Sequence, residues 1–287
     1  MSNSIANDID AIIARAIAEY TGTPLPENIT PEPETTPLET PVTIIPENSN
    51  SILVEETTSR FSGAVWYDKI KEKEVIIAGC GGIGSYLCYL LSRLHPTHIT
   101  IYDPDIVEAV NMSGQMYSIN DIGKYKVDAM AIMAQNYSDY QNMSALAEAY
   151  TNESLTSDIM ICGFDNMKAR KTFFDKWLDH MKHSDCPENC LFIDGRLAAE
   201  TFQVFCIVGN DTASIDRYTK EWLFTDAEAD ATQCSYKQTT FMANMIGSII
   251  VNLFVNFCAN QTNVLIPRDV PFMTEYTAET MYFKVIA

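Results

Sequence analysis

The chain has 287 residues, of which 47% are hydrophobic and 20% are charged, so it can build one large core or two small ones. Its formal net charge of −19 argues against nucleic-acid backbones and anionic membrane surfaces as partners. No run reaches the roughly 18 uninterrupted apolar residues of a spanning helix, and the N-terminus lacks a basic segment followed by a hydrophobic one. We therefore expect a cytoplasmic protein that binds neither nucleic acid nor membranes.

The first 57 residues are predicted to form an acidic arm apart from the rest of the chain. Residues 5–20 space apolar side chains at helical intervals, and residues 23–51 are rich in Pro, Thr, Glu and Asn. Residues 1–58 carry ten Asp or Glu against a single Arg, which is about half of the chain's excess charge. We expect a short helix, then a flexible linker, with the folded domain at 58–287.

From residue 58 onward, strands and helices are predicted to alternate. The apolar patterns indicate strands at 74–78, 98–102, 144–149, 158–163 and 191–194, and helices at 82–94, 123–136, 166–182 and 239–259. Such alternation predicts an α/β, Rossmann-like, mainly parallel sheet with helices on both faces. Two further strands, 201–208 and 281–286, do not alternate with helices and predict an antiparallel extension of the sheet.

A glycine-rich turn joins the first of these strands to the first helix. Residues 79–84 read Gly-Cys-Gly-Gly-Ile-Gly, in which the candidate phosphate-binding positions are Gly79, Gly81, Gly82 and Gly84. Nineteen residues after Gly84, Asp103 ends the second strand, where a carboxylate can accept hydrogen bonds from ribose hydroxyls. The chain is therefore predicted to bind a nucleotide, although this spacing also serves NAD-dependent oxidoreductases.

Further polar residues favour an adenylating enzyme. A lysine offsets charge on the phosphates, and a second carboxylate holds the Mg²⁺ that bridges them. The candidates, in chain order, are Asp105, Asn111, Gln115, Lys124, Lys126 and Asp165. Each has a simpler interpretation when taken alone. Asp165 could cap the following helix, Lys124 and Lys126 could be solvated, and Asp105 could bond only to its turn.

Together these motifs resemble the ThiF/MoeB superfamily of ubiquitin-activating-enzyme-like adenylyltransferases over residues 58–260. The resemblance implies that the glycine loop lies against ATP and that Asp103 binds ribose. It implies phosphate contacts from Asn111 and Lys126, and Mg²⁺ binding by Asp165. It also implies transfer of AMP to the C-terminal carboxylate of a small ubiquitin-like or sulfur-carrier protein by a homodimer.

One arginine of that family is replaced in this chain, and a second has a single candidate. Gly114 stands where most members carry an arginine that clamps the triphosphate, and Arg60 is the candidate for a second arginine, which reaches across the dimer interface. Losing both guanidinium groups would remove charge-assisted bonds to the leaving pyrophosphate. A nucleotide-binding pseudoenzyme that acts as an interaction protein is therefore the alternative function.

The eight cysteines fall into three groups. Five lie in apolar elements, which favours a reducing compartment: Cys80, Cys88, Cys162, Cys206 and Cys258. Cys234 precedes the long helix at 239–259, as the thioester cysteine does in related activating enzymes, so it is either that nucleophile or an ordinary loop cysteine.

The last group contains two cysteines and two nearby histidines: His180, His183, Cys186 and Cys190. These four side chains could hold zinc, but a helix end leading into a polar loop is the simpler interpretation, and we expect no zinc.

Overall fold

The computed structural model describes residues 56–224 and 238–287. The predicted N-terminal helix and linker lie outside the described residues, as does Cys234. The domain boundary after residue 57 therefore stays a prediction.

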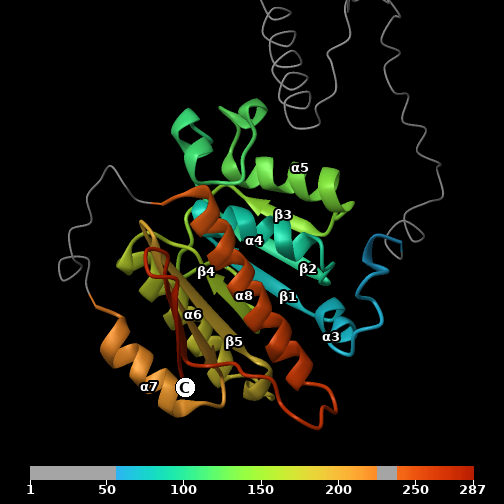
Figure 1. Cartoon of the computed structure of the whole chain (residues 1–287), viewed down its shortest axis with the longest axis vertical. Coiled ribbons are helices and arrows are strands. Elements are labelled where there is room, and N and C mark those ends of the chain that lie inside the picture. Colours follow the sequence, from blue (N-terminus) through green and yellow to red (C-terminus); the bar gives the residue numbers. More distant parts are fainter. Residues whose placement is uncertain (1–55, 225–237) are drawn as a thin grey trace, which may run out of the picture. The chain divides into compact units, whose positions relative to one another are not determined.

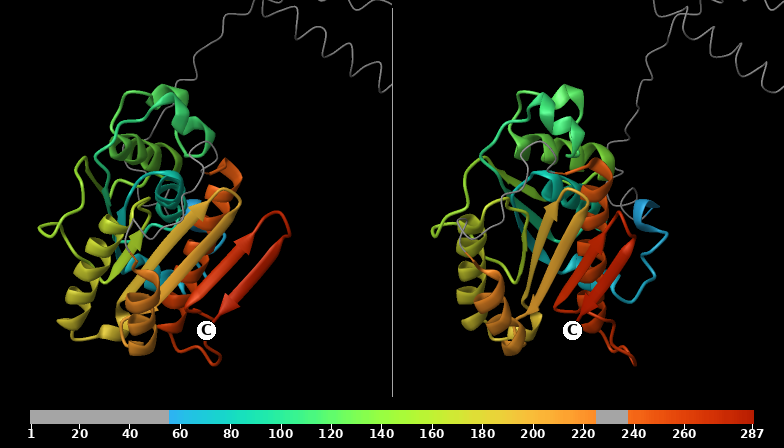
Figure 2. Two further views of the ribbon diagram at one scale, coloured as in Figure 1. Left: turned by 90° about the vertical axis from the view of Figure 1, so that its left-hand side faces the viewer. Right: turned by 60° about the vertical axis from the view of Figure 1, so that its left-hand side comes forward.

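The described residues build a single eight-stranded sheet in the order β3-β2-β1-β4-β5-β6-β7-β8 (Figure 1). The first five strands in this order pair in parallel, and the last three continue the sheet antiparallel (Figure 2). This arrangement confirms the predicted fold class. The strands are β1 (Glu74–Ala78), β2 (His98–Tyr102), β3 (Met143–Leu146), β4 (Ile159–Cys162), β5 (Leu191–Ala198), β6 (Thr201–Val208), β7 (Met273–Thr277) and β8 (Tyr282–Ile286).

Helices cover both faces of the sheet. One apolar cluster joins the strands to α3 (Tyr67–Lys71), α4 (Gly82–Ser92), α5 (Lys126–Ser138) and α8 (Thr240–Asn260). A second, rich in aromatic residues, joins the opposite face to α6 (Met167–Lys182), α7 (Thr212–Arg217) and the π-helical turn Tyr218–Trp222. Because both faces are buried, the parallel strands are almost continuously apolar.

The long helix α8 is a core helix in this fold. By length and composition it is the one described helix that could cross a membrane, yet half of its apolar window is buried. It packs against α4, β5 and β6, and a Cβ on Gly247 would lie 3.2 Å from the Cβ of Tyr86. Asn244, Ser248 and Asn252 form its exposed polar stripe.

Several boundaries differ from those predicted. Helix α5 begins at Lys126 instead of 123, because the preceding residues form the 3₁₀ turn Ile119–Asp121 and a turn at Gly123, whose φ is +89°. Strand β5 runs on to Ala198, since it forms a hairpin with β6 in which Ala198 pairs with Thr201. The mixed polar strand β7 and the short helices α3 and α7 carry no clear period and were not predicted.

Candidate nucleotide-binding site

The glycine loop forms a tight turn from β1 into α4. Gly79 has a φ of +90°, which favours glycine, and its N–H donates to the carbonyl oxygen of Tyr102 on the neighbouring strand at 2.8 Å. A Cβ on Gly84 would overlap the carbonyl oxygen of Gly79, so α4 packs directly on the turn. Helix α4 begins after Gly81 with no side chain capping it, so its first N–H groups are directed at the loop. This geometry suits a phosphate.

Asp103 ties this loop to the end of β2. Its Oδ2 accepts from the N–H of Cys80 at 2.7 Å, and its Oδ1 accepts from the N–H of Asp105 at 2.9 Å. The carboxylate is buried, and burial raises its pKa, while the two hydrogen bonds and the Lys126 ammonium oppose that rise. Each oxygen retains a lone pair that can accept from a ribose hydroxyl.

Lys126 and Asp105 form an ion pair beside Asp103. Lys126 opens α5 and is only 7% exposed; its Nζ lies 2.7 Å from Asp105 Oδ2 and 4.0 Å from Asp103 Oδ1. The interpretation of Lys126 as a solvated lysine is therefore wrong. Lys124 does match that interpretation, because it is partly exposed and pairs with Asp121 at 2.9 Å. Asp105 contacts Lys126 through its side chain and through its carbonyl oxygen, which accepts the N–H of Lys126.

Asp165 lies in the loop from β4 to α6, at the same edge of the sheet. The N-cap of α6 is Asn166, whose side-chain oxygen accepts the N–H of Ala169 at 2.8 Å, so Asp165 is not the cap. Asp165 is exposed, and its carboxylate contacts the Asn166 amide at 3.4 Å.

The glycine loop lies at the point where the order of the strands reverses. It follows β1, which is flanked by β2 on one side and by β4 on the other. Open α/β sheets bind their ligands at this point.

The segment after β2 brings Asn111 and Gln115 toward this edge. The Oδ1 of Asn111 accepts the N–H of Glu108 at 2.8 Å and so caps the 3₁₀ helix Ala109–Ser113. The Oε1 of Gln115 is buried and lacks a hydrogen-bond partner among the described residues. A buried acceptor of this kind calls for a donor from a ligand or water.

Gln238 is a residue of this site that the sequence analysis missed. A Cβ on Gly114 would lie 2.9 Å from the Cγ of Gln238, and a Cβ on Gly82 would overlap its side-chain amide. The Gln238 side chain therefore lies between the start of α4 and Gly114, and an arginine at 114 would have to displace it. Gln238 is distant in sequence from both glycines, and no local pattern distinguishes it.

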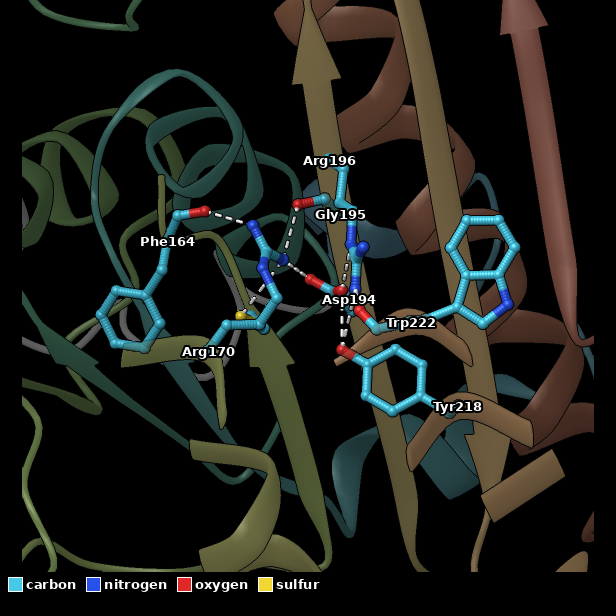
Figure 3. A network of polar contacts seen from close by, with 8 residues as sticks. Phe164, Arg170, Asp194, Gly195, Arg196, Tyr218 and Trp222 are labelled. Atoms are coloured by element: carbon cyan, nitrogen blue, oxygen red, sulfur yellow. Dashed lines mark hydrogen bonds and ion pairs between the residues drawn. The ribbon is translucent and has the colours of Figure 1, made fainter. Parts of the chain in front are cut away.

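A buried ionic network borders the loop that carries Asp165 (Figure 3). Asp194, on β5, is fully buried and forms an ion pair with Arg170 of α6. Arg196 approaches the same carboxylate, with its Nε 2.8 Å from Oδ2, and the hydroxyl of Tyr218 donates to Oδ2 at 2.8 Å.

Arg170 connects that network to the loop between β4 and α6. Its Nη2 donates to the carbonyl oxygen of Phe164, the residue before Asp165 (Figure 3). The network therefore fixes the backbone from which Asp165 projects. The sequence analysis missed this network, although the placement of Asp194 and Arg196 two residues apart in an otherwise apolar strand could have indicated it.

Arg60 is not brought to this site within one chain. It is exposed and lies ahead of α3, which packs on α8 and leads into the start of β1, whereas the glycine loop follows the end of β1 (Figure 1). A contact between Arg60 and the phosphates would need a second copy of the chain.

The sheet order, with the glycine loop and a buried acid at the point where it reverses, defines an α/β domain of the doubly wound class. A model of the ThiF family matches residues 54–286, so the chain belongs to the ThiF family.

The named relatives match only part of the chain. Over 120 residues it is 29% identical to ubiquitin-like modifier-activating enzyme 5 from Bombyx mori, covering 36% of this chain and 30% of that protein. Over 95 residues it is 30% identical to tRNA threonylcarbamoyladenosine dehydratase 1 from Saccharomyces cerevisiae (strain ATCC 204508 / S288c), covering 33% of this chain and 22% of that protein. The matches thus span less than a third of these relatives' length.

A solved structure shows the same fold over most of the chain. The crystal structure of E. coli MccB with ATP superposes with a TM-score of 0.58 at 16% identity, covering 83% of this chain and 70% of that one. At this identity the likeness supports the fold alone.

Proposed function

We propose that this protein uses ATP to adenylate the C-terminal carboxylate of a small ubiquitin-like or sulfur-carrier protein. The observation that carries this proposal is the pairing of a buried Lys126 with Asp105 beside Asp103 and the glycine loop. A dinucleotide oxidoreductase has no chemical use for a lysine at the phosphate end, so this pair favours adenylation over the NAD-dependent alternative. Membership of the ThiF family agrees with it.

The proposed reaction is a displacement at the α-phosphorus of ATP. A carboxylate oxygen of the carrier forms a bond to that phosphorus, the bond to the bridging oxygen breaks, and pyrophosphate leaves with the electron pair. Lys126 and the free N–H groups at the start of α4 would stabilise the developing negative charge. Asp165 offers the exposed oxygen ligand that Mg²⁺ prefers, and the ion would neutralise phosphate charge.

The test is exchange of labelled pyrophosphate into ATP in the presence of Mg²⁺ and a panel of candidate carrier proteins. We expect exchange with at least one carrier and none with the same carrier amidated at its C-terminus. ATP binding without exchange for every carrier would instead support the pseudoenzyme, which Gly114 and the exposed Arg60 favour.

We further propose that Cys234 accepts the acyl group as a thioester. Cys234 lies outside the described residues, but it stands only four positions before Gln238, which contacts Gly82 and Gly114. Covalent geometry limits four residues to a span of about 14 Å. The thiolate would displace AMP from the acyl-adenylate.

Incubation with ATP, Mg²⁺ and carrier should then give an adduct that reducing agent cleaves. Cys234→Ala should lose this adduct and keep pyrophosphate exchange, whereas Cys186→Ser, which alters a cysteine exposed on the described part of the chain, should keep both. An adduct that persists in Cys234→Ala would place the nucleophile elsewhere.

The homodimer and the reducing, cytoplasmic location are also proposals. In such a dimer, Arg60 of the partner subunit would supply the guanidinium that position 114 lacks.

A further inference from the structure

Three side chains with metal-binding atoms converge at the end of the sheet opposite the glycine loop. Asp158 precedes β4, Cys190 precedes β5, and His180 lies in the last turn of α6. Because β4 and β5 are parallel neighbours, their starts share one edge of the sheet, over which α6 ends. The three ligand atoms all lie within 4.8 Å of one another.

The distances in this cluster suit one ion. The Nε2 of His180 lies 2.9 Å from the Oδ1 of Asp158, and the Sγ of Cys190 lies 3.4 Å from the same oxygen. Ligand atoms around a tetrahedral zinc ion are about 3.3–3.8 Å apart, given metal–ligand bonds of about 2.0–2.3 Å. Small side-chain movements would therefore place all three atoms around an ion.

A further contact orients the histidine ring. The Nδ1 of His180 lies 3.1 Å from the hydroxyl oxygen of Thr156. If Nδ1–H donates to Thr156, the lone pair of Nε2 is directed at Asp158 and the cluster. Metal-binding histidines commonly have such a partner on the second ring nitrogen.

The cluster is poorly built for nucleophilic catalysis. The carboxylate of Asp158 contacts both other members, so it keeps the imidazole from acting directly on the thiol. The Cys190 thiol is buried and lies 3.4 Å from the Asp158 carboxylate, surroundings that disfavour a free thiolate. Sulfur, imidazole and carboxylate are, by contrast, the donors that zinc takes in proteins.

The sequence analysis set aside a zinc site at His180, His183, Cys186 and Cys190, and two of these residues do not take part in the cluster. His183 is exposed, and its Nδ1 bonds to the carbonyl oxygen of Asp179 in the preceding turn. Cys186 is exposed, and its N–H bonds to Ser184. Asp158, which stands 22 residues before His180, replaces them.

We propose that Asp158, His180 and Cys190 bind a zinc-type divalent ion that ties the end of α6 to the starts of β4 and β5. Cys190 is buried, while the side chains of His180 and Asp158 are 29% and 50% exposed, so a fourth position faces solvent and takes water. Binding releases the Cys190 thiol proton to solvent.

The test uses the full chain stripped with a chelator and titrated with Co²⁺, then with Zn²⁺. We expect one equivalent of Co²⁺ to give a thiolate-to-cobalt charge-transfer band in the near ultraviolet, which Zn²⁺ then abolishes. Zn²⁺ should also raise the melting temperature of the stripped protein.

The matched variants separate this site from others on the chain. His180→Gln and Cys190→Ser should lose the band and the rise in melting temperature, whereas His183→Gln and Cys186→Ser should keep both. His180→Gln changes a partly exposed residue, so it gives a result even if Cys190→Ser does not fold. Absence of a thiolate band in the wild type, or a band that depends on Cys186, would overturn the proposal.

Discussion

Among single residues, Asp165 is the one whose replacement should separate loss of activity from loss of stability. Its carboxylate is exposed beside the glycine loop, and Asn166 takes the capping role, so replacing Asp165 removes no helix cap. Asp165→Ala should abolish Mg²⁺-dependent pyrophosphate exchange while the melting temperature stays unchanged. Asp175→Ala, which breaks a surface pair with Lys171 on the same helix, is the control and should keep wild-type exchange. Unchanged exchange in Asp165→Ala would remove the Mg²⁺ assignment.

Gly114 and Gln238 should be energetically coupled. Gly114 is buried against the Gln238 side chain and has a φ of −147°, so side-chain volume, and not backbone strain, limits substitution there. Gly114→Arg alone should lower the free energy of unfolding by about 1–3 kcal/mol through overpacking. Gln238→Ala should restore most of that loss in the double variant. A double-mutant cycle by urea denaturation measures the coupling, and additive effects would contradict the contact.

The sequence yielded candidate site residues where a local pattern exists. The glycine spacing, Asp103, Lys126 and Asp165 each follow a predictable strand or open a predictable helix, and the structure brings them to one edge of the sheet. Gln238 could not be found this way, because its contacts with Gly82 and Gly114 join segments more than 120 residues apart. Asp158 was missed although its partners His180 and Cys190 are only 22 and 32 residues away, because they belong to other elements whose packing no local pattern encodes.

At the scale of elements, the network of Arg170, Asp194 and Arg196 should hold α6, β5 and the π-helical turn together. Asp194→Asn leaves two guanidinium groups without their buried counter-charge, so we expect a loss of about 3–5 kcal/mol in the free energy of unfolding. Asp175→Asn, which alters an exposed pair, should cost less than about 1 kcal/mol. Comparable losses in the two variants would show that the network contributes little.

Elements were predictable where one period dominates. The strands β1, β2 and β6 have the bounds expected from their apolar runs, and α6 and α8 differ by one residue at most at each end. The hairpin extension of β5 and the strand β7 depend on pairing with distant strands, which a single-sequence period does not encode.

At the scale of the whole molecule, alkaline pH should destabilise the fold through its buried thiols. Burial raises the pKa of Cys258 to about 12, above the value of about 8.5 for an exposed thiol. At a pH between these two pKa values, the unfolded chain has released the thiol proton that the folded chain still holds. The contribution of this thiol to the free energy of unfolding is therefore fully present below the lower pKa and is lost as the pH rises towards the higher one. The loss is about 1.4 kcal/mol per pH unit for this group.

Urea denaturation of the wild type and Cys258→Ala from pH 8 to 11 measures this contribution. The variant should be less stable at pH 8, because a buried side chain is truncated, and the difference should shrink as pH rises. A pH-independent difference would show that the thiol does not stay protonated in the folded chain.

The position of Arg60 makes the dimer testable. If Arg60 of the partner subunit completes each site, Arg60→Ala should lower exchange by about two to three decades. Mixing Arg60→Ala with Asp165→Ala should then restore up to about a quarter of wild-type exchange, since half of the dimers are mixed and each holds one intact site. No recovery on mixing would place Arg60 outside the catalytic unit.

The most direct test of the adenylation proposal is to detect its product. Cys234→Ala is incubated with ATP, Mg²⁺ and the carrier that supports exchange, and the intact mass of the carrier is measured at once. We predict a carrier heavier by one adenylyl group at its C-terminus, formed with release of pyrophosphate and absent with Asp165→Ala. Bound ATP together with a carrier of unchanged mass would contradict it.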